Sequence, residues 1–296
     1  MKQGSPSVLR TAPPTSWGSV NVRPPSASLG EVPEGRRGSR NEAASQTVNG
    51  TLNGIRTTWA LPEEIPVALQ FNSQPYAVMM ATPADLQDFA IGFALSEGLV
   101  RHGSDIANVL VMPSGEGFAV DVSVPEEVLI RERMIKRTIE GRVGCGLCGI
   151  EELEDAIRMP NGKLPHQVLH AAVVARAFDA LAQHQPMNAV NRTVHAAAWA
   201  SAQGAIQIAR EDVGRHNALD KLIGAMAREK ISPRGGFVLM SSRCSFELVQ
   251  KCAIVGIAAL ATISAPTALA YKLAGQAGLQ LAALSKQGVM MFDGEA

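Results

Sequence analysis

The hydrophobic pattern before residue 140 predicts two β-hairpins with a helix between them. Residues 65–82 alternate apolar and polar positions around a turn at Asn72–Ser73, and residues 109–124 alternate in the same way. Residues 82–100 repeat leucine, phenylalanine and alanine at helical spacing. This front half is therefore predicted to be α+β.

From about residue 194 the pattern changes to strands that alternate with helices. The predicted strands are residues 196–201, 205–210, 236–240, 257–263 and 279–285, and the predicted helices are residues 218–230, 246–256 and 268–278. Strands connected through helices pair in parallel, with the helices on the sheet faces and the loops at one edge. Such sheets bind ligands at that edge, so the sequence predicts an α/β fold with a ligand site there.

Composition and pattern divide the chain into four parts. Residues 1–56 are rich in proline, serine, glycine and arginine without apolar periodicity, so we predict a disordered tail. An organellar transit peptide is the alternative, but proline and glycine would interrupt its amphipathic helix. We expect an N-terminal α+β part at residues 57–140, a mobile CxxC loop at 141–150 and a C-terminal α/β part at 151–296.

Charge and apolar content argue against several classes of protein. The 296 residues carry 27 basic and 27 acidic side chains, and this balance does not favour nucleic-acid binding. The most apolar stretch, residues 253–263, is too short to cross a membrane, and the first 50 residues hold no signal-peptide run. The four cysteines lack the spacing of a secreted disulfide scaffold. We therefore expect a cytoplasmic protein with no nucleic-acid and no membrane partner.

Two arginines lie beside predicted helix starts at the ligand edge. Arg215 and His216 precede the helix at 218–230, and Arg243 lies in a serine-rich loop before the helix at 246–256. A helix N-terminus offers free N–H groups, and arginine binds phosphate through parallel hydrogen bonds. Ordinary helix capping is the alternative explanation. The chain has no GxGxxG or GxxxxGKS sequence, so the pattern indicates an anionic ligand held without a standard dinucleotide or P-loop motif.

The stretch GCGLCG places Cys145 and Cys148 among glycines with two residues between them. Structural zinc usually takes four ligands, and no second CxxC is present, so we predict no metal site. A zinc deaminase needs His-x-Glu, whereas His195 is followed by Ala197 at the glutamate position. A mobile cysteine suits a carrier that moves sulfur between two partners. A structural pair in a noncatalytic chaperone and a dithiol–disulfide oxidoreductase are the alternatives.

Six motifs occur in the order found in a known family. They are CGLCG, TVHAAAW, EDVGRHNALDKLIG, SSRCSFELVQK, SAPTALAYKLA and LQLAALSKQG. On these motifs the chain resembles the FdhD family of formate dehydrogenase accessory sulfurtransferases over residues 57–293. The resemblance implies a cytidine-deaminase-like three-layer fold, with helices packed on a mixed sheet and without deaminase chemistry. Together with the apolar helices of the back half, it also implies a homodimer.

The resemblance further implies a function as a sulfurtransferase. The family accepts sulfur from a cysteine desulfurase as a persulfide. It passes this sulfur to the molybdenum (or tungsten) cofactor that carries two guanine dinucleotides, Mo-bis(molybdopterin guanine dinucleotide), which then enters the catalytic subunit of formate dehydrogenase. Cys145 matches the persulfide carrier, and Cys148 matches a second cysteine that assists or resolves. The C-terminal part would bind the cofactor as the acceptor substrate.

The residues expected to bind the cofactor lie in three loops. They are Leu284, Ser285, Lys286, Gln287, Gly288 and Val289, together with Arg215, His216 and Arg243. Its diphosphates would contact Arg215, Arg243 and Lys286. The family often has arginine where this chain has Val289. Cys244 also departs from the usual family pattern, and it is either a harmless small residue or a third thiol in the sulfur relay.

Overall fold

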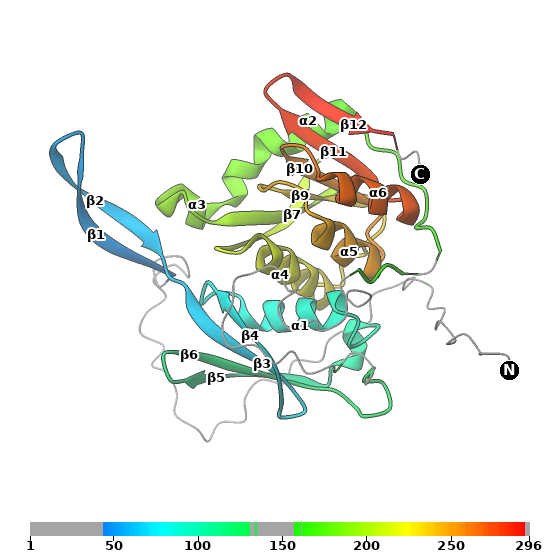
Figure 1. The fold of residues 1–296 in the computed structure, drawn as a ribbon, viewed down its shortest axis with the longest axis horizontal. Coiled ribbons are helices and arrows are strands. Elements are labelled where there is room, and N and C mark those ends of the chain that lie inside the picture. Colours follow the sequence, from blue (N-terminus) through cyan, green and yellow to red (C-terminus); the bar gives the residue numbers. More distant parts are fainter. Residues whose placement is uncertain (1–43, 131–133, 135–156, 161, 294–296) are drawn as a thin grey trace, which may run out of the picture.

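The computed structural model describes residues 44–130, 134, 157–160 and 162–293. These residues form three sheets and the helices that pack against them (Figure 1). The predicted carrier loop with Cys145 and Cys148 lies outside the described residues. None of the described helices is both long enough and apolar enough to cross a membrane.

A six-stranded sheet forms the centre of the C-terminal half. Its strands are β7 (His195–Ser201), β8 (Ile206–Asp212), β9 (Gly236–Met240), β10 (Ala259–Ile263), β11 (Gln280–Ser285) and β12 (Gly288–Phe292), in the order β12-β11-β10-β9-β7-β8. β9, β10 and β11 are parallel, β7 is antiparallel to both β8 and β9, and β12 is antiparallel to β11. The sheet is therefore mixed, and β8, β9, β10 and β11 end at the same edge, as predicted.

Helices pack on both faces of this sheet (Figure 1). They are α2 (Ala171–Leu181), α4 (Arg215–Arg228), α5 (Phe246–Ile254) and α6 (Ala268–Ala277), whereas the short α3 (Pro186–Asn191) packs in a separate small cluster with Ala44 and Val194. α2 shares one buried cluster with β7, β9, β10 and β11, whereas α4, α5 and α6 belong to the cluster on the other face. This arrangement confirms the predicted three-layer α/β fold, because apolar helix faces and a two-sided buried sheet cover one another.

The N-terminal half adds a second sheet and one helix. These elements are β3 (Ile65–Phe71), β4 (Gln74–Ala81), α1 (Leu86–Ser96), β5 (Asn108–Ser114) and β6 (Gly117–Ser123), with the strand order β4-β3-β6-β5. Both predicted hairpins are present, and Asn72 and Ser73 have the positive φ angles that their turn requires. α1 lies between this sheet and α4, so it joins the two halves (Figure 1).

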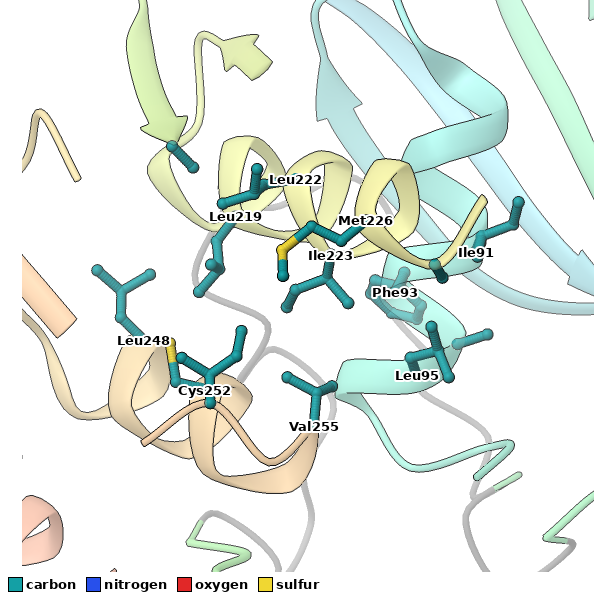
Figure 2. Packing of buried hydrophobic residues seen from close by; sticks show 14 of the residues in the cluster. Ile91, Phe93, Leu95, Leu219, Leu222, Ile223, Met226, Leu248, Cys252 and Val255 are labelled. Atoms are coloured by element: carbon teal, nitrogen blue, oxygen red, sulfur yellow. The ribbon is translucent and has the colours of Figure 1, made fainter. Parts of the chain in front are cut away.

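Three helices from the two halves share one apolar core. Figure 2 shows side chains of α1, α4 and α5 that point toward one another. The backbones of α1 and α4 approach closely at Gly92 and Gly224. A Cβ atom at Gly92 would lie 1.7 Å from the Asp220 carbonyl oxygen, and one at Gly224 would lie 1.9 Å from that of Asp88. Only glycine permits this crossing, which sets α4 against the N-terminal half.

A projecting hairpin corrects the predicted tail. β1 (Ser45–Leu52) and β2 (Ile55–Pro62) form a two-stranded antiparallel arm that extends from the body (Figure 1). The prediction of disorder up to residue 56 is therefore wrong for residues 44–56. Asn53 and Gly54 both have positive φ, and an Asn-Gly pair favours this tight hairpin turn. Threonine-rich strands on either side have high strand propensity, which the composition of the whole segment obscured.

Candidate functional site

The carboxyl ends of three strands place the predicted ligand residues along one edge of the six-stranded sheet. Arg215 and His216 open α4 directly after β8, and Arg243 lies between β9 and α5. Lys286 and Gln287 form the turn between β11 and β12. The common direction of these strands brings loops that are distant in sequence to one edge.

This edge is long compared with one phosphate group. β7, β9 and β10 separate β8 from β11, so the loops that carry Arg215 and Lys286 are four strand spacings apart. At about 4.8 Å per spacing, roughly 19 Å separates these loops. Arg215 and Lys286 therefore do not contact one phosphate together, and only an extended ligand reaches both.

The C-terminal stretch divides into a packed part and an exposed part. Leu284 pairs with Val289 across the β11–β12 hairpin, and both side chains pack against the cluster under α2. Ser285 Oγ accepts a hydrogen bond from the Gln287 backbone N–H at 3.2 Å, which shapes the turn. Lys286 and Gln287 are exposed. Lys286 and Gln287 therefore present polar side chains at the surface of the sheet edge, whereas Leu284 and Val289 pack in the hairpin.

Three polar side chains meet where α4 and α5 begin. His216 is 3% exposed, and its Nε2 lies 3.5 Å from Ser245 Oγ and 3.9 Å from Glu247 Oε2. Burial alone would raise the pKa of Glu247, but the neighbouring His216 and Ser245 outweigh it and hold this pKa at about 2. Glu247 is therefore a carboxylate at neutral pH, and it joins the first turns of the two helices.

A buried arginine donor and a neutral imidazole lie beside this cluster. The Nε atom of Arg215 is buried and has no hydrogen-bond partner among the described residues. A buried donor of this kind is satisfied when an anion binds. His195 begins β7 opposite Asp212. Burial lowers the pKa of His195, and the nearby Arg215 and His216 lower it further against the effect of Asp212, so His195 is neutral at pH 7.

Cys244 does not have the properties of a relay thiol. It is fully buried, and burial with the nearby Glu247 carboxylate raises the pKa of its thiol to about 12. The nucleophile in sulfur transfer is a thiolate, which a thiol of this pKa does not form at neutral pH. The relay hypothesis is therefore wrong for Cys244, which packs in the core as Cys252 does.

The described residues provide neither a set of zinc ligands nor the glutamate of a deaminase. Ala197, at the position of the deaminase glutamate, is fully buried within β7. Among the residues that the structure describes, no three His, Cys, Asp or Glu side chains lie close enough together to hold a metal ion.

Several polar residues beneath this edge are not among the residues predicted from the sequence. Asp212, Lys221 and Glu247 are buried next to the ligand loops. One signal for the first two was available, because EDVGRHNALDK places several charges at the start of a helix that is otherwise apolar. Charges at buried helix positions indicate specific partners, since an unpaired buried charge is costly.

Comparisons with known proteins agree with this architecture. Residues 62–292 match the FdhD/NarQ family. A protein of Bordetella petrii named sulfur carrier protein FdhD is 44% identical over 241 residues, which are 81% of this chain and 87% of the relative. A protein of the same name from Xanthomonas campestris is 49% identical over 218 residues, covering 74% of this chain and 78% of the relative.

A solved structure supports the same fold. It is a protein from Desulfotalea psychrophila described as a formate dehydrogenase accessory protein, with a TM-score of 0.64, 24% identity, and coverage of 84% of this chain and 96% of that one. At this identity the likeness concerns the fold alone. The match over residues 62–292 and the two close relatives establish that this chain belongs to the FdhD/NarQ family.

Proposed function

We propose that this protein is a sulfurtransferase that carries sulfur for the activation of formate dehydrogenase. Family membership and the names of the relatives support the sulfur-carrier function. The observation that carries the proposal furthest is the row of cationic loops and helix N-termini along one sheet edge. This edge suits an extended ligand with several phosphates, such as a cofactor with two guanine dinucleotides.

The chemistry begins on the CxxC cysteines. The Cys145 thiolate attacks the outer sulfur of a cysteine desulfurase persulfide, the S–S bond breaks, and the desulfurase thiolate leaves. Cys145 then carries the persulfide. Attack of the Cys148 thiolate on the inner sulfur forms a Cys145–Cys148 disulfide and releases sulfide to the acceptor. A small-molecule thiol reductant restores the two thiols for the next transfer.

The acceptor substrate that we propose is the molybdenum cofactor with two guanine dinucleotides. Arg215, Arg243 and Lys286 would bind its diphosphates, together with the first N–H groups of α4 and α5. The buried Nε of Arg215, which has no partner within the described part of the chain, supports this assignment. His195 supplies a neutral imidazole beside the phosphates, where it adds no further charge to the site.

Three protein partners follow from this function. The sulfur donor is a cysteine desulfurase, the recipient of the cofactor is the catalytic subunit of formate dehydrogenase, and a second copy of this chain forms a homodimer. We place these encounters in the cytoplasm. The exposed apolar side of the β1–β2 arm supports the homodimer, because an uncovered apolar face favours association.

Mass spectrometry tests the carrier function directly. The protein is incubated with a cysteine desulfurase and isotopically labelled cysteine, and the peptides are analysed with and without reductant. We expect one labelled sulfur on the Cys145 peptide that reductant removes, and none in Cys145→Ala. Cys244→Ala is the matched control and keeps the label, because its thiol is buried. If no label reaches Cys145 while the protein still activates formate dehydrogenase, the protein acts as a noncatalytic chaperone.

A further inference from the structure

One buried carboxylate organises the loop between β8 and α4. Asp212 is fully buried at the end of β8. Its Oδ1 accepts hydrogen bonds from the Gly214 N–H at 2.8 Å and from Asn217 Nδ2 at 3.0 Å. Its Oδ2 accepts from the Thr82 N–H at 3.0 Å and lies 2.6 Å from Lys221 Nζ. These four donors fill the usual acceptor positions of a carboxylate.

Lys221 supplies the charge that this carboxylate requires. The lysine is fully buried, and its Nζ also donates to the Thr82 carbonyl oxygen at 2.9 Å. Removing two charges from water costs free energy that their attraction often fails to offset, so a buried ion pair is weak support for a stability role. The position of this pair, directly beside the ligand loop, points to a role in shaping that loop.

The bonds of Asp212 hold the loop on both sides of its ligand residues. Gly214 precedes Arg215 and His216, and Asn217 follows them. Asn217 Nδ2 also donates to the Met80 carbonyl oxygen at 2.8 Å. The loop is thus attached to the N-terminal half immediately before and immediately after Arg215 and His216.

Thr82 adds a second link to the N-terminal half. Its Oγ1 accepts a hydrogen bond from the Val213 N–H at 3.1 Å, and its own N–H donates to Asp212. Because Thr82 is fully buried, neither bond competes with water.

We propose that Asp212, held by Lys221, is a positioning residue for the anion-binding edge. It contacts no ligand itself. It sets the direction in which Arg215 and the first N–H groups of α4 face the phosphates, so that these donors need no rearrangement when the ligand binds. The inference rests on the proposed function, because it assigns a phosphate ligand to this loop.

A second buried aspartate provides a matched control. Asp220 lies on α4, is also buried, and pairs with the buried Lys251 at 3.0 Å. Ser96 Oγ donates to its Oδ1 at 2.6 Å. Asp220 therefore faces α1 and α5, whereas Asp212 faces the ligand loop. Substitution by asparagine removes one buried charge in each case, but it disturbs the loop only at Asp212.

The test measures binding of GDP, which carries one guanosine and one diphosphate, by isothermal titration calorimetry. We expect Asp212→Asn to weaken the affinity about tenfold or more, the loss typical of a misplaced charge-assisted contact. Asp220→Asn should stay within about twofold of the unsubstituted protein, because Asp220 bonds to Ser96 and Lys251 and, among the residues that the structure describes, makes no bond to the loop. Circular dichroism confirms that each variant is folded at the temperature used. A merely structural role would lower the melting temperature of both variants and leave the affinity of the folded protein unchanged.

The outcomes separate this inference from the proposed function. If the unsubstituted protein does not bind GDP, the proposed ligand is wrong and the positioning role fails with it. If it binds GDP and folded Asp212→Asn binds equally well, only the positioning role is overturned. If Asp212→Asn does not fold, the affinity of Thr82→Val for GDP tests the positioning role instead. This substitution removes the hydroxyl that accepts from the Val213 N–H and keeps the buried Asp212–Lys221 ion pair. Unchanged affinity in Thr82→Val would then contradict the proposal, and weakened affinity would support it.

Discussion

Glu247 depends on its neighbours for its charge state. The residue is 9% exposed, and in an apolar environment such a carboxyl would tend to keep its proton. His216 and Ser245 reverse that tendency, and the pKa of Glu247 falls to about 2. The resulting carboxylate lies 3.9 Å from His216 Nε2, so the predicted anion edge includes a fixed negative charge that limits its net positive charge.

The stability of the protein in acid should depend on the charge of the Glu247 side chain. The ordinary pKa of glutamate is 4.5 and the folded value is about 2, so the folded state binds this proton less readily than the unfolded state. The contribution of Glu247 is fully present above about pH 5 and disappears as the pH falls toward 2, with a total of about 3 kcal/mol at most. Urea unfolding from pH 6 to pH 3 measures it. The free energy of unfolding of Glu247→Gln should fall less over this range. If it falls with pH as steeply as that of the unsubstituted protein, the prediction is wrong.

The positions of the predicted ligand residues beside helix starts were predictable from sequence, whereas their buried partners were not. Arg215 and Arg243 precede helices in a strand–helix alternation, and this local pattern indicates an anion site. The bond from Thr82 to Asp212 joins residues 130 positions apart. No local pattern encodes it, because it arises only when α1 and α4 have packed together.

Elements of the N-terminal half position the site through one helix crossing. α1 and α4 meet at Gly92 and Gly224, and α4 begins with the ligand residues. The buried ion pair of Asp220 and Lys251 connects the same two helices to α5. The close approach of α1 and α4 therefore sets the distance between the N-terminal half and the sheet edge.

A methyl group at Gly224 should separate the two helices. The added Cβ would lie 1.9 Å from the Asp88 carbonyl oxygen, and backbone atoms cannot yield as a flexible side chain does. We expect Gly224→Ala to lower the free energy of unfolding by about 3 kcal/mol or more, the upper range for overpacking. Gly50→Ala is the control, since nothing lies within 4 Å of that position, and it should change stability by less than about 1 kcal/mol. Equal effects of both changes in urea unfolding would rule out the crossing as the cause.

The β1–β2 arm has one apolar side and one polar side, and this difference bears on how the whole molecule associates. The pairs Val48–Trp59 and Leu52–Ile55 lie on one side, whereas Asn49–Thr58 and Thr51–Arg56 lie on the other. Ile55 is 72% exposed and Trp59 is 43% exposed. A two-stranded hairpin is marginally stable alone, so an arm with one uncovered apolar side gains stability when a partner covers it.

We expect this apolar side to contribute to the proposed homodimer. Ile55→Lys combined with Trp59→Lys places two charges on the apolar side and should shift the protein from dimer to monomer. Size-exclusion chromatography with light scattering measures the molar mass. Thr58→Lys adds a charge to the polar side and should leave the dimer intact. A monomeric unsubstituted protein, or a dimer that survives the double substitution, would show that the arm has no such role.

Local sequence was sufficient for the elements after residue 194 and for the edge on which the predicted ligand residues lie. The alternation of strands and helices after residue 194 implies parallel strands, and parallel strands deliver their loops to one edge. The Asn53–Gly54 turn of the arm was also readable locally, but the composition of the surrounding segment outweighed it.

Tertiary packing alone decided which side chains support that edge. Asp212 meets Lys221 and Thr82 in a fully buried site, and Glu247 meets His216 between two helix starts. Hydrophobic periodicity and secondary-structure propensity act over a few residues. These contacts join segments that come together only when the apolar faces of α1, α4 and α5 are buried against one another. Burial then raises the cost of an unpaired charge, so the partner of each buried charge is determined by the packed structure and not by its neighbours in sequence.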